Sequence, residues 1–97
     1  MTTRQVTIRG HVQNFSTKNS ISKAQVNIFD YNRGSWVSSD LSDANGNYSI
    51  TVNLEIGANN QVQISALAQK EGFAPSGRKS SSRRSNITVN FWLIVGP

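Results

Sequence analysis

The 97-residue sequence has no cysteine, only two prolines and only five acidic residues. Without cysteine, the chain cannot form a disulfide, a thiolate nucleophile or a sulfur-ligated zinc or iron site. Long apolar runs are also lacking. The longest, at residues 91–95, has five residues, whereas a membrane-spanning helix needs about 20. Residues 1–9 contain no apolar segment of the kind found in secretory signals. We therefore expect no membrane insertion.

The abundant residues favour β-structure. Val, Ile and Thr account for 22 residues, and Ser and Asn for another 25. β-Branched side chains suit strands, whereas Ser and Asn compete with the hydrogen bonds of a helix. Val, Ile, Leu and Phe make up 24 residues, which is enough for one hydrophobic core in a chain of this length. We expect a single domain over residues 1–97, with its core between about residues 6 and 93.

Alternation of apolar and polar residues predicts where the strands lie. Such stretches occur at residues 6–12, 24–28, 36–41, 48–54, 62–68 and 87–93. With one further weak strand, the spacing of strands and turns predicts an all-β fold, a seven-stranded antiparallel Ig-like β-sandwich. The basic stretch 76–85 has nothing to bury, so we expect a flexible loop there. The side chains predicted to fill the core are Val6, Ile8, Val12, Val26, Ile28, Tyr48, Ile50, Val52, Ile64, Ala66, Val89, Phe91 and Leu93.

Four segments of the chain, residues 8–12, 21–28, 42–50 and 66–73, resemble the carboxypeptidase regulatory-like, or transthyretin-like, family of β-sandwiches. The positions that carry the resemblance are Gly10, Ala24, the motif Asp43-x-Asn45-Gly46-x-Tyr48 and Gly72-Phe73. The resemblance implies a non-catalytic accessory or surface module, because such domains are appendages of enzymes, adhesins, transporters and surface assemblies. A shared fold sets this class but not the ligand.

Related pilin and adhesin domains close themselves with an isopeptide bond between a Lys in the first strand and an Asn in the last. Here the last strand offers Asn86 and Asn90, but the first strand carries Arg4 and Arg9 in place of a lysine. The sequence therefore disfavours this cross-link.

No constellation of residues predicts catalysis, a cofactor or a metal. His11 is the only histidine, and its place on the polar side of the first strand favours an exposed surface residue. Asp40, Asp43 and Asn45 resemble the first half of a calcium loop, but no carboxylate follows at the closing position. Asp and Asn commonly bond their own backbone in a turn, so we predict a turn there rather than a metal site.

Four large apolar residues have the parity of the outer face of a sheet: Phe29, Leu67, Trp92 and Ile94. A bulge that shifts the register, or cover by the loop 74–85, would account for some of them. The alternative is a face on which a partner docks, since exposed apolar patches usually mark interaction sites. If the four lie on one outer face, they form one docking surface.

Basic residues cluster only at Arg78, Lys79, Arg83 and Arg84, within a net charge of +5. No aromatic residue lies between them to stack on bases, so nucleic acid is disfavoured. A solvated loop explains the cluster, as does a loop that becomes ordered against an acidic protein. We include the four residues in the predicted interface.

The leading hypothesis is a non-catalytic module that binds protein or self-associates in a surface assembly, such as a virion decoration protein. If residue 1 is the native start, the chain stays in the cytoplasm or leaves it in an assembly that needs no signal. The alternative is a carbohydrate-binding accessory domain of a secreted or cell-surface protein, with Tyr31 and Trp36 as stacking residues. An enzyme is the weakest hypothesis, because neither a nucleophile with its base nor a metal site can be assembled.

Overall fold

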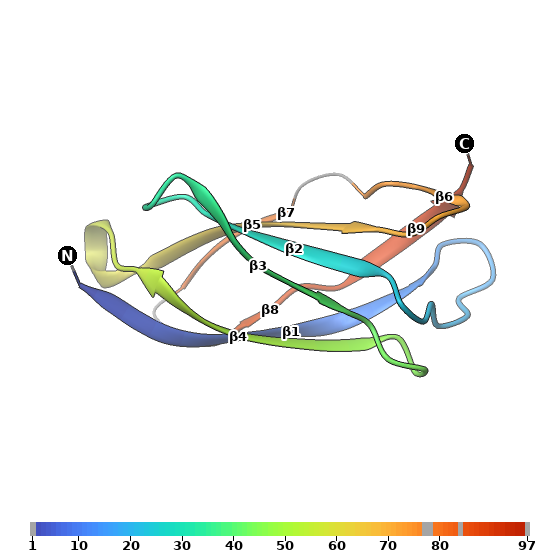
Figure 1. Cartoon of the computed structure of the whole chain (residues 1–97), viewed down its shortest axis with the longest axis horizontal. Coiled ribbons are helices and arrows are strands. Elements are labelled where there is room, and N and C mark those ends of the chain that lie inside the picture. Colours follow the sequence, from blue (N-terminus) through green and yellow to red (C-terminus); the bar gives the residue numbers. More distant parts are fainter. Residues whose placement is uncertain (1, 77–78, 84, 97) are drawn as a thin grey trace.

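Two facing β-sheets make up the molecule (Figure 1). A computed structural model of the chain describes residues 2–76, 79–83 and 85–96. The molecule is elongated, with principal extents of 42 × 23 × 17 Å. Its one helical segment within these residues is a short 3-10 turn, η1 (Ala58–Asn60). None of the described residues forms a helix with the length and hydropathy needed to span a bilayer.

The five-stranded sheet has the order β4-β1-β9-β6, with β8 also paired to β1. Its members are β1 (Thr3–Asn14), β4 (Asn47–Glu55), β6 (Phe73–Ala74), β8 (Ile87–Thr88) and β9 (Phe91–Val95). The four-stranded sheet has the order β3-β2-β5-β7. Its members are β2 (Gln25–Asp30), β3 (Ser35–Leu41), β5 (Val62–Gln69) and β7 (Lys79–Arg83). In Figure 1, β1 and β4 run along the lower side of the molecule and β2 and β5 above them.

The predicted β-sandwich is confirmed, but the number and direction of its strands differ from the prediction. The described residues form nine strands rather than seven. Both β8 and β9 run parallel to β1, so the sandwich is not wholly antiparallel. The predicted strand at 87–93 is divided in two because residues 89 and 90 leave the ladder. There, Val89 N–H donates to the Arg9 carbonyl at 2.9 Å, and the Asn90 side chain accepts from His11 N–H at 3.0 Å.

The basic stretch predicted as a loop contains strand β7 instead. Its backbone pairs with β5 from Lys79, opposite Ala66, to Arg83, opposite Val62. A strand at the edge of a sheet needs only one hydrogen-bonding neighbour, so a Ser-rich sequence with little to bury can still occupy it. Arg78, Arg84 and the side chain of Arg83 lie outside the described residues.

The core between the sheets matches the alternation read from the sequence. Twelve of the thirteen predicted core side chains are buried, and Val52, at the edge strand β4, is half-buried and packs against the others. The side chains that join this core beyond the predicted set are Ile21, Ala24, Leu54, Val62, Ala68 and Ile87. A continuous core of this kind holds both outer faces in fixed positions, which is what a binding surface requires.

Candidate functional site

The four residues predicted to form one docking surface lie on two different sheets. Phe29 in β2 and Leu67 in β5 occupy the outer face of the four-stranded sheet. Trp92 and Ile94 in β9 occupy the outer face of the five-stranded sheet. A single shared surface is therefore excluded, and the two pairs have to be judged separately.

The face around Phe29 is largely covered by its own side chains. The Phe29 ring meets Tyr31 edge-on at 5.5 Å and Trp36 at 5.2 Å, with interplanar angles of 77° and 76°. Phe29 and Leu67 are only half-exposed, and Ser65, which lies opposite Phe29 on the same face, is buried. Perpendicular rings also fail to offer one flat platform to a sugar.

A β-bulge does occur beside Phe29, and a bulge is one of the two explanations offered above for the outward parity of the apolar residues. The pairing of β2 with β3 shifts between Ile28 and Phe29, which leaves Val37 as the extra residue. Because the extra residue is on β3, the parity of β2 is unchanged and Phe29 still points outward. The bulge therefore does not bring Phe29 into the core.

Trp92 and Ile94 line an apolar groove that we call the Trp92 groove. It has a volume of about 300 Å³ and is lined by Phe15, Ala74, Pro75, Ser76, Lys79, Trp92 and Ile94. Three of these are large apolar side chains with high exposure: Phe15 at 53%, Trp92 at 43% and Ile94 at 57%. Ala74, Pro75, Ser76 and Lys79 line the groove beside Trp92, rather than covering it.

Phe15 was not predicted as an interface residue from the sequence, because it is a single apolar residue in a polar stretch. It follows β1 directly, and its N–H donates to the Leu93 carbonyl at 2.8 Å, which fixes its backbone beside β9. The ammonium group of Lys18 lies 4.6 Å from the centre of the Phe15 ring and donates to the Phe15 carbonyl at 2.7 Å. A contact between residues 15 and 93 depends on the parallel pairing of β1 with β9, which the sequence pattern does not indicate.

Lys79, one of the four basic residues in the predicted interface, contacts Trp92. It lies opposite Ala66, on the side of β7 that faces the core, so its side chain reaches across to the other sheet. Its ammonium group is 4.8 Å from the Trp92 ring and 5.5 Å from the Phe91 ring, and it donates a hydrogen bond to the Asn90 carbonyl. This cation–π contact holds the indole against the wall of the groove and adds positive charge beside it.

His11 is half-buried and braces the polar end of the fold, rather than lying free on the surface. Its Nε2 is 2.8 Å from the Asn45 carbonyl and 2.9 Å from Ser20 Oγ, and its Nδ1 is 3.0 Å from Gln13 Oε1. A carbonyl can only accept, so Nε2 carries a proton and cannot take one from Ser20. His11 Nδ1 contacts the side-chain amide of Gln13, whereas in a catalytic triad this nitrogen contacts a carboxylate.

The carboxylates near the tightest turn are occupied by the backbone. Asp43 Oδ1 accepts from the N–H groups of Asn45 and Asn47, each at 2.9 Å, and Asp40 Oδ1 accepts from Leu41 N–H at 2.8 Å. Gly46 has a φ of +79°, as the predicted turn requires. Across the described ranges, no three His, Asp or Glu side chains come together as a metal site would require.

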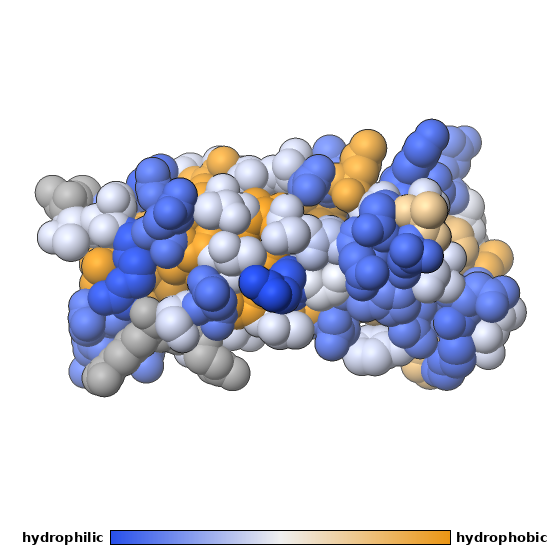
Figure 2. All heavy atoms as spheres, turned by 90° about the horizontal axis from the view of Figure 1, so that it is seen from below, coloured by the Kyte–Doolittle hydropathy of each residue, from blue (hydrophilic) through white to orange (hydrophobic). Residues whose placement is uncertain are grey.

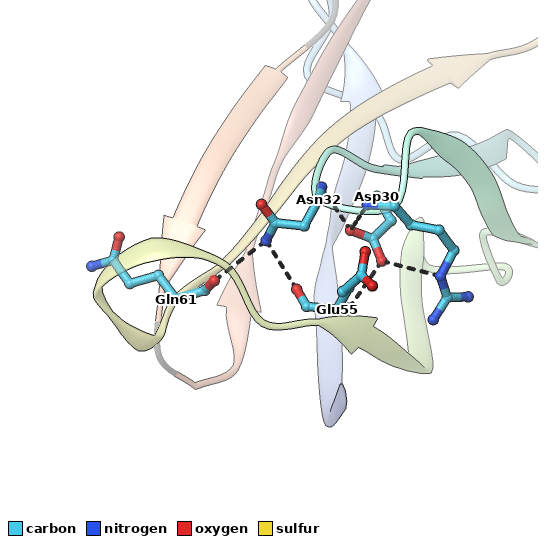
Figure 3. A network of polar contacts seen from close by, with 5 residues as sticks. Asp30, Asn32, Glu55 and Gln61 are labelled. Carbon is cyan, nitrogen blue, oxygen red and sulfur yellow. Dashed lines mark hydrogen bonds and ion pairs between the residues drawn. The ribbon is translucent and has the colours of Figure 1, made fainter. Parts of the chain in front are cut away.

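Asp30 is a buried carboxylate that joins the two sheets (Figure 3). Its Oδ1 accepts from Asn32 N–H at 3.1 Å and Arg33 N–H at 3.3 Å, and its Oδ2 accepts from Glu55 N–H at 3.0 Å. The Asn32 side-chain amide donates to the Glu55 carbonyl at 2.9 Å. Both oxygens thus serve backbone groups, which gives Asp30 a structural role.

Tyr48 is also held by burial and one strong hydrogen bond. Its hydroxyl donates to the Val89 carbonyl at 2.6 Å. Burial raises the pKa of Tyr48, because the charged phenolate would lose its hydration. The phenol therefore stays protonated and works as a donor.

Comparison with known proteins places this architecture among solved β-sandwiches. The C-terminal domain of the shaft pilin spaA from Lactobacillus rhamnosus GG is similar, with a TM-score of 0.69 at 12% identity, over 96% of this chain and 99% of that one. The 3-chlorocatechol 1,2-dioxygenase from Rhodococcus opacus 1CP is similar with a TM-score of 0.65 at 9% identity. That match covers 98% of this chain and 61% of the dioxygenase. No family model and no curated protein sequence matches the chain. At these identities the likeness shows the fold alone.

Proposed function

We propose that this chain is a non-catalytic structural module that binds another protein through the Trp92 groove. The observation that carries the proposal is the gathering of Trp92 and Ile94, from β9, and Phe15, from just after β1, around one concave apolar surface. Removing such surface from water contributes about 25 cal/mol per Å², which offsets part of the entropic cost of association. Large aromatic side chains in a concave setting are typical anchors of protein interfaces.

The groove is also pre-formed, which lowers the entropic cost of binding. Trp92 lies in a strand, and the ammonium group of Lys79 contacts its ring. Little side-chain freedom is then lost when a partner binds. The positive charge of Lys79, within a chain of net charge +5, favours a partner with an acidic rim. The Arg78, Arg83 and Arg84 side chains remain part of this proposal as sources of the same attraction.

A variant pair with matched chemistry tests the proposal. Trp92→Ser removes the anchor, and Trp36→Ser removes a tryptophan of nearly equal exposure, 46% against 43%, from the opposite sheet. The wild-type chain and the two variants are immobilised separately and incubated with an extract of the source. The wild type and Trp36→Ser should retain the same partner protein, and Trp92→Ser should not retain it. Melting curves must show both variants folded. Equal retention by Trp92→Ser and wild type would refute the proposal.

The setting of such a module is a surface assembly, and we propose a virion or pilus-like particle as the larger structure. Two features support an assembly role: the resemblance of residues 8–12, 21–28, 42–50 and 66–73 to accessory β-sandwiches, and the similarity to a shaft pilin domain. The carboxypeptidase regulatory-like relationship itself is part of the proposal. Immunogold labelling of purified particles with antibody against the chain tests the setting, and label confined to free protein would contradict it.

A carbohydrate-binding role is the second candidate, and Trp36 carries it. This ring is 46% exposed on the face opposite the Trp92 groove. Titration with a panel of oligosaccharides, followed by tryptophan fluorescence in wild type and Trp36→Ser, separates the two roles. A saturable change that Trp36→Ser abolishes would support the sugar site.

A further inference from the structure

Strand β4 has one hydrogen-bonded neighbour, β1, and its other edge pairs with no strand of the described residues. Two further hydrogen bonds lie just beyond the ends of the pairing between β1 and β4. At one end Ile56 N–H donates to the Thr2 carbonyl at 3.0 Å, and at the other Val12 N–H donates to the Gly46 carbonyl at 2.8 Å. In an antiparallel ladder, hydrogen-bonded pairs alternate along the strand. The even-numbered residues of β4 therefore bond to β1, and the N–H and C=O groups of its odd-numbered residues point to the free edge.

Both ends of this free edge are occupied by other parts of the chain. At the start of β4, the backbone of Asn47 exchanges hydrogen bonds with Asp43, at 2.8 and 2.9 Å. At its end, Asp30 accepts from Glu55 N–H and Asn32 donates to the Glu55 carbonyl (Figure 3). Between these caps, the edge-facing backbone groups of Ser49, Thr51 and Asn53 have no partner within the described part of the chain, and all three residues are exposed.

The other strand edges carry features that discourage pairing with another chain. Strand β3 has the bulge at Val37 and a charged residue, Asp40, on the side that faces the core. Strand β7 has Lys79 on its core side. Strands β6 and β8 have two residues each. Bulges, inward charges and shortness are the usual means of protecting an edge. Strand β4 is long, its nine residues pair with β1 without a register shift, and it has no charged residue between its two caps.

We propose that a second copy of this chain pairs with β4 along this edge, antiparallel and about a two-fold axis at Thr51. In that register Thr51 lies opposite Thr51 of the second copy, and Ser49 lies opposite Asn53. All three are hydrogen-bonded pairs, so each exchanges two backbone bonds and every uncapped group is satisfied. The two five-stranded sheets become one continuous sheet, and both copies use the same surface, as the isologous contact of a symmetric dimer requires.

A second copy fits this edge because the contact is self-complementary and uncharged. The odd-numbered side chains of β4 between its caps are Ser49, Thr51 and Asn53, so no like charges meet across the axis. Thr51 Oγ1 already shares a hydrogen bond with Thr7 Oγ1 at 3.0 Å, and pairing extends this row of threonines across the dimer. Arg9 on β1 lies opposite Ser49. In the dimer, Ser49 is followed across the sheet by Asn53 and Gln5 of the second copy, neither of which is charged.

The face of the five-stranded sheet agrees with this arrangement. Figure 2, which looks at the molecule from the side of β1 and β4, shows hydrophilic and neutral residues over most of the surface, with hydrophobic strips between them. Partners of opposite charge are not needed at such an edge. Because each copy carries +5, we expect the dimer to tighten as salt screens their repulsion.

Sedimentation equilibrium from about 10 μM to about 1 mM tests the proposal. We expect the wild-type mass to rise from 10.6 kDa toward twice that value. Thr51→Lys places two like charges directly opposite each other at the axis, and it should weaken the dimer at least about tenfold. Thr7→Lys is the matched control: it has the same residue type, the same charge change and the same lost hydrogen bond, but one strand away from the axis. It should change the affinity less than about threefold.

Amide exchange measured by NMR identifies the edge directly. As the concentration rises, the amides of Ser49, Thr51 and Asn53 should become protected in the wild type, whereas those of Ser49 and Asn53 should stay unprotected in Thr51→Pro. That variant removes an N–H that the monomer does not use and is compatible with an edge strand. Tyr48 and Ile50 should be protected throughout, which shows that β4 stays paired with β1.

Three results would overturn the inference: a wild-type monomer at about 1 mM, equal weakening by Thr51→Lys and Thr7→Lys, or a dimer lost in Trp92→Ser but kept in Thr51→Lys. The last result would place self-association in the Trp92 groove and leave the proposed function standing. Conversely, a dimer that survives Trp92→Ser supports the inference whether or not the groove binds a partner. The two proposals therefore succeed or fail independently.

Discussion

Replacing Asp30 by Ala removes the one carboxylate that ties the end of β2 to the end of β4. Asp30 is fully buried and accepts from the N–H groups of Asn32, Arg33 and Glu55. After the substitution these donors have no acceptor, and Glu55, itself buried, cannot recover one from water without opening the edge. An unsatisfied buried donor costs more than the hydrogen bond was worth.

The magnitude follows from the number and kind of these bonds. Each hydrogen bond to a charged group contributes about 1.5–3 kcal/mol, and contributions within one network do not add fully. We expect Asp30→Ala to lower the free energy of unfolding by about 3–5 kcal/mol, a large part of the total of about 5–15 kcal/mol for a domain of this size. The corresponding loss in melting temperature is more than about 12 °C.

Urea unfolding followed by circular dichroism measures this loss, and three variants check its origin. Asp30→Asn keeps one oxygen acceptor but turns an amide N–H₂ toward a backbone donor, so it should cost about half as much. Arg33→Ala removes an ion pair whose atoms are 3.9 Å apart and whose arginine is 43% exposed, and it should cost less than about 1 kcal/mol. Asp40→Ala, at an exposed aspartate, should cost as little. A loss below about 1 kcal/mol for Asp30→Ala would refute the reasoning.

Four further variants or treatments have defined outcomes. Because the pKa of Tyr48 is raised in the folded state, its contribution to stability is complete below its unfolded pKa of about 10 and falls above it; Tyr48→Phe should flatten that part of the alkaline loss in urea titrations at different pH. Phe91→Ala should cost about 3–5 kcal/mol by chemical unfolding. Gly10→Ala would place a methyl group into the Val89 carbonyl and should lower the melting temperature strongly. Calcium or EDTA should leave the melting temperature unchanged, because Asp43 already bonds the backbone.

The core could be predicted because strand periodicity is a local signal. Alternation alone identified twelve buried side chains correctly, and it misjudged only Val52, which sits where β4 has no neighbour. Strand β7 could not be predicted in this way. Its serines carry no apolar pattern, and its pairing with β5 comes from backbone groups that every sequence has.

The candidate sites were predictable only in part, since both depend on pairings between distant strands. Parity marked Trp92 and Ile94 as outward-facing, but only the parallel pairing of β9 with β1 brings Phe15 beside them. The sequence shows a turn after Asp30 but not that its carboxylate reaches Glu55 in the other sheet. The free edge of β4 is likewise a property of sheet order, and no residue type marks it.

The free edge and the Trp92 groove lie at opposite sides of the same sheet, and this placement has a consequence for assembly. In the order β4-β1-β9-β6, the groove is built on β9 and on the chain that leaves β6, while β4 is the far edge. Pairing through β4 therefore leaves both grooves open, one on each side of the two-fold axis and both on the same face of the continuous sheet. Two weak sites joined in one rigid unit bind a repeating surface far more tightly than either alone, because the second contact is made at a high effective concentration. A dimer held by a short uncharged edge is sufficient for this, since docking on a regular surface would itself keep the two copies together.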